Sequence, residues 1–324
     1  MVIQMKSFMK NVAGLLVALG ISSSAAAYPE KPINLVVVFG AGGTSDVVAR
    51  QVGQSLGDVL KTEIVVLNRP GAGGNVGAAS VAKAVPDGYT LLAGFPGLTT
   101  NGALYQKLGY DPEKDFVPIS RVASAPNVIV VPATSTATTL KDFIAQASQK
   151  PAGLSFGSAG AGSSSHLAGE LLKEITGLNF THIPYKGGTP ALVDLASGRL
   201  DLMIIPLPEA INLINSGKIK PLALASDRRS KLIPNVPTTS EAGLNNFVVG
   251  SWYGLLAPRG TPDKAVAVLS DATAKALKSE SLIKSFDASG IEMVASTPEE
   301  FRKFLTDETN RWRAVIEKNK IRLD

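Results

Sequence analysis

Two Gly/Ser-rich loops hold the residue types best suited to bind a small anion. The first loop follows an apolar run and precedes a predicted helix at residues 46–56, so backbone N–H groups of the first helical turn lack helical partners. Gly42 and Gly43 let a ligand come close to the backbone, and Thr44 and Ser45 add hydroxyl donors. The pattern predicts half of a site for a small carboxylate. The alternative is structural, with Thr44 or Ser45 acting only as the helix N-cap.

The second loop repeats this arrangement about a lobe further along the chain. Residues 157–165 follow a predicted strand and precede a predicted helix at residues 166–176. The expected ligand-binding positions here are Gly160, Ala161, Gly162, Ser163 and Ser164. Together the two loops suggest a ligand clamped between two helix N-termini. A low-complexity linker is the alternative, which the apolar runs on both sides disfavour.

Glycines at residues 71–77 do not form a dinucleotide-binding fingerprint. Gly71 and Gly73 are followed by Val76 where the third glycine is due, and no P-loop lysine follows. We expect this loop to lie at the mouth of a cleft, with Asn75 as a polar contact. Phe95, at the end of the third predicted strand, is expected to line the same cleft.

The elements that carry these loops form two α/β lobes. Strands are expected at residues 33–39, 63–67 and 89–94 with helices between them, which is the β-α-β-α-β pattern of a parallel sheet. The chain is expected to cross between lobes near residues 125–127 and again at residues 248–256. The predicted fold is therefore a two-lobe α/β binding protein with a hinge of two crossing strands. We expect residues 28–126 and 252–324 to form lobe 1 and residues 127–251 to form lobe 2.

The first 27 residues resemble a secretory leader. Lys6 and Lys10 precede an apolar segment at residues 12–21, and small residues end at Ala27. Cleavage after Ala27 would leave Tyr28 first in a protein exported to the periplasm. The sequence contains no cysteine, so neither a disulfide nor a lipid-anchoring cysteine is expected.

Composition argues against several other functions. The formal charge of +5 includes the two leader lysines, so the mature chain carries 5 − 2 = +3, with basic residues scattered and aromatics only 6% of the chain. Nucleic-acid binding is therefore not expected. Only two histidines are present, and no G-x-S-x-G motif or clustered metal ligands occur. We expect no enzymatic activity, no metal and no cofactor.

Six motifs, in order, resemble the Bug-type solute-binding proteins, which are extracytoplasmic receptors of tripartite tricarboxylate transporters. They are YPEKPI at 28–33, AGGTSD at 41–46, NRPGAGGN at 68–75, PDGYT at 86–90, GSAG at 157–160 with residues 163–170, and PYKG at 184–187. The resemblance covers essentially all of the mature chain. It implies a type II Venus-flytrap fold that closes on a small organic acid, and the membrane subunits of such a transporter as partners.

The resemblance also suggests roles for residues. Residues 42–45 and 160–164 would hold one ligand carboxylate from the two lobes, bordered by His166 and by the loop of Tyr185, Gly187 and Gly188. The family often has proline after the first-strand phenylalanine, but this chain has Gly40 there. This difference leaves the identity of the ligand more open. Di- and tricarboxylates, amino acids and aromatic acids all fit this expectation.

Two other functions stay open at the level of sequence. An exported hydrolase is one, and the other is a sensor that presents its closed form to a receptor kinase. A monomer is the expected state of a two-lobe receptor.

Overall fold

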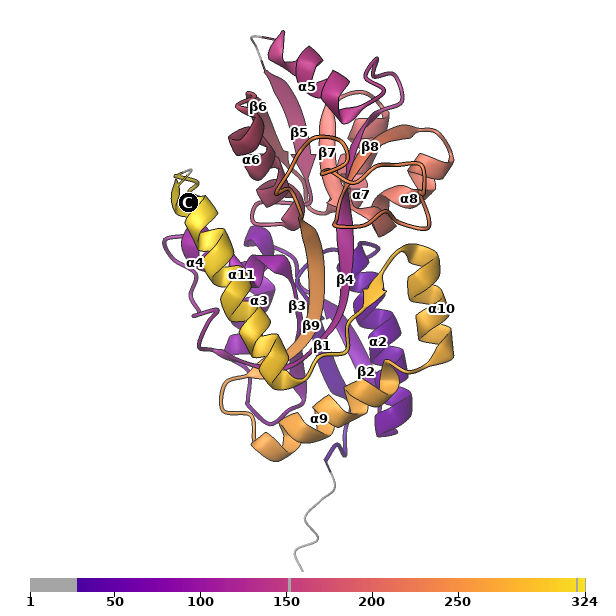
Figure 1. Ribbon diagram of the computed structural model, residues 1–324. Coiled ribbons are helices and arrows are strands. Elements are labelled where there is room, and N and C mark those ends of the chain that lie inside the picture. The colour runs from indigo at the N-terminus through magenta and orange to yellow at the C-terminus, as the bar shows by residue number, and fades with distance from the viewer. Residues whose placement is uncertain (1–27, 151–152, 319, 324) are drawn as a thin grey trace, which may run out of the picture. The chain divides into compact units, whose positions relative to one another are not determined.

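One long strand, β4 (Phe116–Pro132), is shared by two groups of strands in the computed structural model of the chain (Figure 1). The structure describes residues 28–150, 153–318 and 320–323. Residues 1–30 and 31–324 form separate units, and the fold described below is that of the second unit. The predicted leader and its cleavage site lie outside the described residues.

The first group of strands is the predicted β-α-β-α-β unit. β1 (Ile33–Val37) lies between β2 (Ile64–Asn68) and β3 (Thr90–Gly94) and is parallel to both. The connecting helices are α2 (Thr44–Leu60) and α3 (Asn75–Ala82). Parallel strands that are covered by helices on both faces have continuous apolar sequences. β1 fits this rule, because four of its five residues are buried.

The second group repeats the parallel arrangement. β5 (Leu154–Ser158) pairs in parallel with β6 (Phe180–Pro184) and β7 (Leu202–Pro206). β7 and β8 (Ile219–Ala225) each run antiparallel to the second half of β4. The helices of this lobe are α5 (Leu140–Ser148), α6 (Ser164–Thr176), α7 (Gly188–Ala196) and α8 (Leu207–Asn215).

Two neighbouring strands connect the lobes. β9 (Gly250–Pro258) pairs antiparallel with β4 from Phe116 to Pro126, and β3 pairs with the other edge of β9. From Asn127 onward β4 pairs instead with β7 and β8. The expected crossing at residues 125–127 is flanked by apolar stretches at 119–122 and 128–131, and all three segments lie within this one strand.

The remaining elements lie mainly beside the first lobe. They are the short helices η1 (Ala72–Gly74), η2 (Pro96–Thr99) and α4 (Asn101–Leu104), then α9 (Asp263–Ala276), α10 (Glu280–Ser289), β10 (Glu292–Met293) and α11 (Pro298–Lys318). A capping box opens α11, because Glu300 N–H donates to Thr297 Oγ1 and the Glu300 carboxylate accepts from Thr297 N–H. The order Thr261–Pro262 is typical of an N-cap followed by the first helical residue, but Thr261 does not cap α9. Its hydroxyl donates to Pro258 O, and Pro262 is the capping residue.

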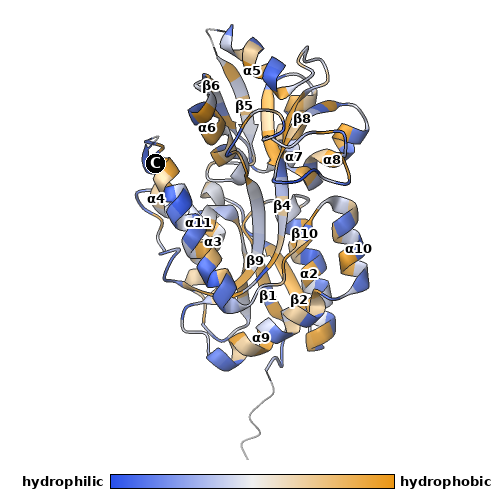
Figure 2. Cartoon of the chain, viewed as in Figure 1, coloured by the Kyte–Doolittle hydropathy of each residue, from blue (hydrophilic) through white to orange (hydrophobic). Residues whose placement is uncertain are grey.

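β1, β2 and β7 are largely apolar, whereas α11 alternates polar and apolar residues along its length (Figure 2). One core cluster contains Val36, Phe95 and Trp252, packed with Phe301 of α11. A second contains Phe156 and Leu172, packed with Trp312 and Ile316 of the same helix. α11 therefore contributes to the cores of both lobes. Within the described part of the chain, no helix is long and apolar enough to cross a membrane.

Candidate functional site

Four helix N-termini meet around one cavity of about 80 Å³. They are the first turns of α2, α6, α7 and α8, so the partial positive ends of four helices face a common space. The lining residues are Phe39, Gly40, Ala41, Gly43, Thr44, Ser45, Pro96, Ala159, Ser163, Ser164, Ser165, Lys186, Gly187, Gly188, Thr189, Pro190, Pro206, Glu209, Ser251 and Tyr253. Both lobes contribute to this wall.

The α2 side of the cavity is built on an extended glycine. Gly43 is the N-cap of α2 and has an extended backbone, with φ −79° and ψ 167°. The helix therefore begins at Thr44, two residues before the predicted start. Asp46 lies behind the loop and accepts hydrogen bonds from Gly42 N–H, Arg50 and Asn68. Burial alone would raise the pKa of Asp46, but these hydrogen bonds outweigh it and hold that pKa below its ordinary value. Asp46 thus fixes the loop.

The α6 side is built from consecutive serines. Ser163 caps the helix by accepting from His166 N–H at 3.3 Å, so α6 begins at Ser164. The hydroxyl of Ser164 is 2.7 Å from that of Ser251 on β9. Ser165 is fully buried and lines the cavity, yet its hydroxyl has no hydrogen-bond partner among the described residues. The amides of the first helical turn have no helical acceptor, so this corner presents several donors together.

Two stacked histidines support the α6 loop from behind. The rings of His166 and His182 lie 4.1 Å apart, and His166 Nδ1 accepts from Gly162 N–H at 3.2 Å. His182 Nε2 lies 2.6 Å from the hydroxyl of Ser158. Burial lowers the pKa of His166 to about 3 and that of His182 to about 4, so both rings are neutral near pH 7. Their geometry is that of a structural support.

A carboxyl group from the second lobe reaches the α2 end of the cavity. Glu209, in the first turn of α8, accepts hydrogen bonds from the Thr44 hydroxyl at 3.1 Å and from Thr44 N–H at 3.4 Å. Burial raises the pKa of Glu209, although the two bonds from Thr44 act in the opposite direction. Tyr253 of β9 lines the same space, and burial together with the nearby Glu209 raises the pKa of its phenol.

The structure brings together part of the predicted ligand-binding set. Residues from three of the predicted loops line the cavity, namely Gly43, Thr44, Ser45, Ser163, Ser164, Gly187 and Gly188. Other predicted residues are not among the lining residues, namely Gly42, Asn75, Phe95, Gly160, Ala161, Gly162, His166 and Tyr185. Direct ligand contact by any of these residues stays a prediction.

The residues outside the cavity wall have visible structural partners. Asn75 Oδ1 accepts from Asn101 at 2.7 Å and from the Tyr110 hydroxyl at 2.9 Å. Phe95 is fully buried with its ring edge-on to Phe39. The hydroxyl of Tyr185 donates to Asp194 at 2.7 Å. These side chains hold the loops that form the wall.

Sequence reasoning did not select several lining residues. Ser165 lies in the second Gly/Ser loop, and Ser251 and Tyr253 fall in the second crossing strand, but none of the three was predicted to bind the ligand. Glu209 lies in the first turn of α8, directly after β7, and was not among the predicted ligand-binding residues. The sequence signal that could have identified Glu209 is an acidic residue directly after the end of a strand and at the start of a helix.

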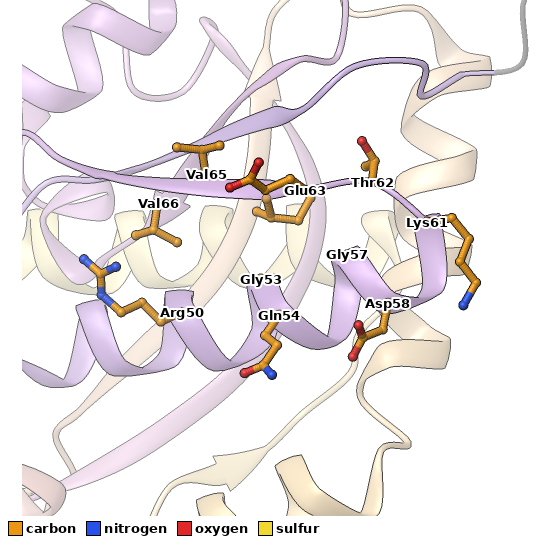
Figure 3. A pocket seen from close by; sticks show the side chains of 11 residues that line it. Arg50, Gly53, Gln54, Gly57, Asp58, Lys61, Thr62, Glu63, Val65 and Val66 are labelled. Carbon is orange, nitrogen blue, oxygen red and sulfur yellow. The ribbon is translucent and has the colours of Figure 1, made fainter.

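A larger hollow, of about 810 Å³, lies elsewhere, between α2 and β2 at the edge of the sheet (Figure 3). Its walls carry Arg50, Asp58, Lys61 and Glu63, side chains of both signs. None of its described lining residues has a buried side-chain oxygen or nitrogen without a hydrogen-bond partner. The small cavity is therefore the better candidate site. Among the described residues, no three histidine, aspartate or glutamate side chains gather as a metal site would require.

Comparison with known proteins gives consistent matches. Residues 48–321 match the model of the tripartite tricarboxylate transporter family receptor. BugT of Bordetella pertussis is 37% identical over 310 residues, covering 94% of this chain and 95% of BugT.

Solved structures agree. Rpa4515 of R. palustris with adipate is 37% identical with a TM-score of 0.87, covering 91% of this chain and 100% of that chain. MatC of Rhodopseudomonas palustris with bound malate is 33% identical with a TM-score of 0.85, covering 89% of this chain and 100% of that chain.

Proposed function

Because the chain belongs to the tripartite tricarboxylate transporter receptor family, we propose that it captures a small organic carboxylate in the periplasm and delivers it to the membrane subunits of such a transporter. This family consists of solute-binding receptors and not of enzymes, so the hydrolase alternative is set aside. The observation that carries the proposal is the convergence of four helix N-termini on one small cavity. Two similar structures hold adipate and malate, both dicarboxylates.

The α6 corner is the proposed carboxylate site. The amides of Ser164 and Ser165 and the unpartnered Ser165 hydroxyl would donate to the ligand oxygens. Hydrogen bonds to a charged acceptor are shorter and stronger than neutral ones, and the α6 dipole adds to them. Ser163, Gly160, Ala161 and Gly162 would hold the loop in this conformation.

We propose that ligand binding shifts the two lobes toward the arrangement in which they are close together. The cavity wall takes residues from both lobes, so a ligand that bonds to both sides stabilises the arrangement in which they are close. β4 and β9 are the proposed hinge, with the lobe boundaries at residues 126/127 and 251/252. A membrane partner would recognise the ligand-bound form. Export through cleavage after Ala27 and a monomeric state belong to the same proposal.

A thermal-shift panel of small carboxylates on the chain beginning at Tyr28 tests this function. The protein is unfolded and refolded first so that no carried-over ligand remains. A ligand at 100 times its Kd stabilises by about 2.7 kcal/mol, which for a chain of this length corresponds to a rise in Tm of roughly 4 °C. The proposal fails if neutral or cationic compounds raise Tm and no carboxylate does.

Delivery needs a separate test. Uptake of the identified acid is measured in cells that express the transporter membrane subunits, with and without this chain. Uptake that requires both supports delivery, and uptake that is indifferent to this chain contradicts it.

A further inference from the structure

We propose that Glu209 makes this cavity selective for carboxylic acids that also carry an ammonium group. The inference rests on the proposed function and narrows its ligand class. It arises from an acid that the fold places inside a cavity otherwise lined by backbone amides and hydroxyls.

Glu209 is held in place from two lobes. Its Oε1 accepts both hydrogen bonds from Thr44 at the start of α2, while its backbone belongs to the first turn of α8. Gly188, at the start of α7, lies against the other side of the carboxyl group, since a Cβ atom there would overlap Glu209 Oε2. The carboxyl group is thus positioned by three of the four helix N-termini.

The second oxygen of this carboxyl group is unused. Glu209 Oε2 is buried and has no hydrogen-bond partner among the described residues. A buried acceptor without a donor is unfavourable, and a ligand that supplies the donor removes that cost on binding. An ammonium group supplies up to three donors and a compensating positive charge.

The charges of the wall favour the same ligand. Among the lining residues only Glu209 and Lys186 can carry a charge, and Lys186 is exposed. Burial raises the pKa of Glu209, and a cation beside its carboxyl group favours the charged form. The cavity therefore has an acidic end at Glu209 and a donor-rich end at Ser164 and Ser165. A zwitterion satisfies both ends. A dicarboxylate would place its second negative charge beside Glu209, where like charges repel and one carboxyl group must take up a proton.

Three matched triads of acids test the inference by calorimetric titration. Each triad keeps one carboxylate and varies the other group between ammonium, hydroxyl and carboxylate. The triads are L-alanine, L-lactate and methylmalonate; β-alanine, 3-hydroxypropanoate and succinate; and 4-aminobutanoate, 4-hydroxybutanoate and glutarate. We expect the ammonium member to bind at least tenfold more tightly than the dicarboxylate in each triad that binds, with the hydroxy acid between them.

The variants separate charge from shape. Glu209→Gln keeps an oxygen that accepts from Thr44 but removes the negative charge, so the ratio of the two affinities should fall to one or reverse. Glu299→Gln makes the same change in net charge on the exposed surface of α11 and should leave the ratio unchanged.

The inference is overturned if the wild-type protein prefers the dicarboxylates, or if Glu209→Gln keeps the tenfold ratio. Should Glu209→Gln fail to fold, judged by its melting curve, the wild-type ratio alone decides. Carboxylates that bind without an ammonium preference would leave the proposed function standing and remove only this inference. Binding by none of the nine acids would overturn this inference, and the wider thermal-shift panel of carboxylates would then decide the proposed function.

Discussion

Ser165 is an unusual residue in this fold, because a fully buried hydroxyl normally has a hydrogen-bond partner. It lies in the first turn of α6, where the helix already presents unpaired amides. A hydroxyl left unpaired at such a place is explained by a partner that arrives with the ligand.

Ser165→Ala should therefore weaken carboxylate binding without harming the fold. We expect Kd to rise about tenfold or more, since a hydrogen bond to a charged group contributes about 1.5–3 kcal/mol. The Tm of the ligand-free protein should stay the same or rise slightly, because no internal bond is lost. Titration and melting curves measure the two effects.

Ser216→Ala is the matched control, because Ser216 is exposed and bonds only within its own turn at Leu213. It should change neither quantity. A Ser165→Ala variant that binds as tightly as wild type would show that this hydroxyl does not contact the ligand.

The buried histidines predict a loss of stability in acid. The pKa of His166 is lowered to about 3, below the ordinary 6.5, so the folded state favours the neutral ring. The stabilisation is fully present above pH 6.5 and is lost as the pH falls toward 3, by at most about 1.4 kcal/mol per pH unit. Urea unfolding at pH 7, 6, 5 and 4 measures the slope.

His166→Gln provides the comparison, since a glutamine oxygen can still accept from Gly162 N–H. Its free energy of unfolding should fall less steeply with acid than that of the wild type. Parallel curves for the two proteins would contradict the assignment, because carboxyl groups elsewhere titrate equally in both.

At the scale of elements, the start of α7 sets the position of Glu209. Gly188→Ala would place a methyl group on Glu209 Oε2, with Ile205 Cδ1 also only 2.8 Å from the new Cβ. The carboxyl group must then leave its place beside Thr44. We expect this variant to lose the ammonium preference in the same triads as Glu209→Gln.

Gly102→Ala is its control, because the new Cβ would lie 3.4 Å from Pro112 and away from the cavity. It should bind like wild type. A Gly188→Ala protein that folds and keeps the full ammonium preference would show that Gly188 does not control Glu209.

The elements were largely predictable, because periodicity and glycine loops are local signals. The parallel strands and the two Gly/Ser loops before helices were confirmed, although α2 and α6 begin two residues earlier than expected. Those shifts arise because Gly43 and Ser163 are extended, which periodicity does not report. The bond between Thr44 and Glu209 joins residues 165 positions apart. No local pattern predicts such a pair, so the acidic end of the cavity emerged only from the structure.

At the scale of the whole unit of residues 31–324, three elements join the lobes where the sequence indicated two. β4 and β9 were expected as the crossings, and α11 is the addition. The helix begins against the first core through Phe301 and ends against the second through Trp312 and Ile316. Its amphipathic pattern was evident, but which surface its aromatic residues cover depends on tertiary packing.

This connection predicts that the two lobes unfold together. Calorimetry of the ligand-free protein should give one transition, because each lobe loses part of its core when α11 or β4 detaches. Trp312→Ala should cost about 3–5 kcal/mol and lower that single Tm by roughly 5–8 °C. Lys303→Ala, an exposed change on the same helix, should have little effect.

Two separate transitions in the wild type, or a Trp312→Ala variant in which only one part melts early, would show that the lobes unfold independently. Ligand-driven closure would then depend on β4 and β9 alone.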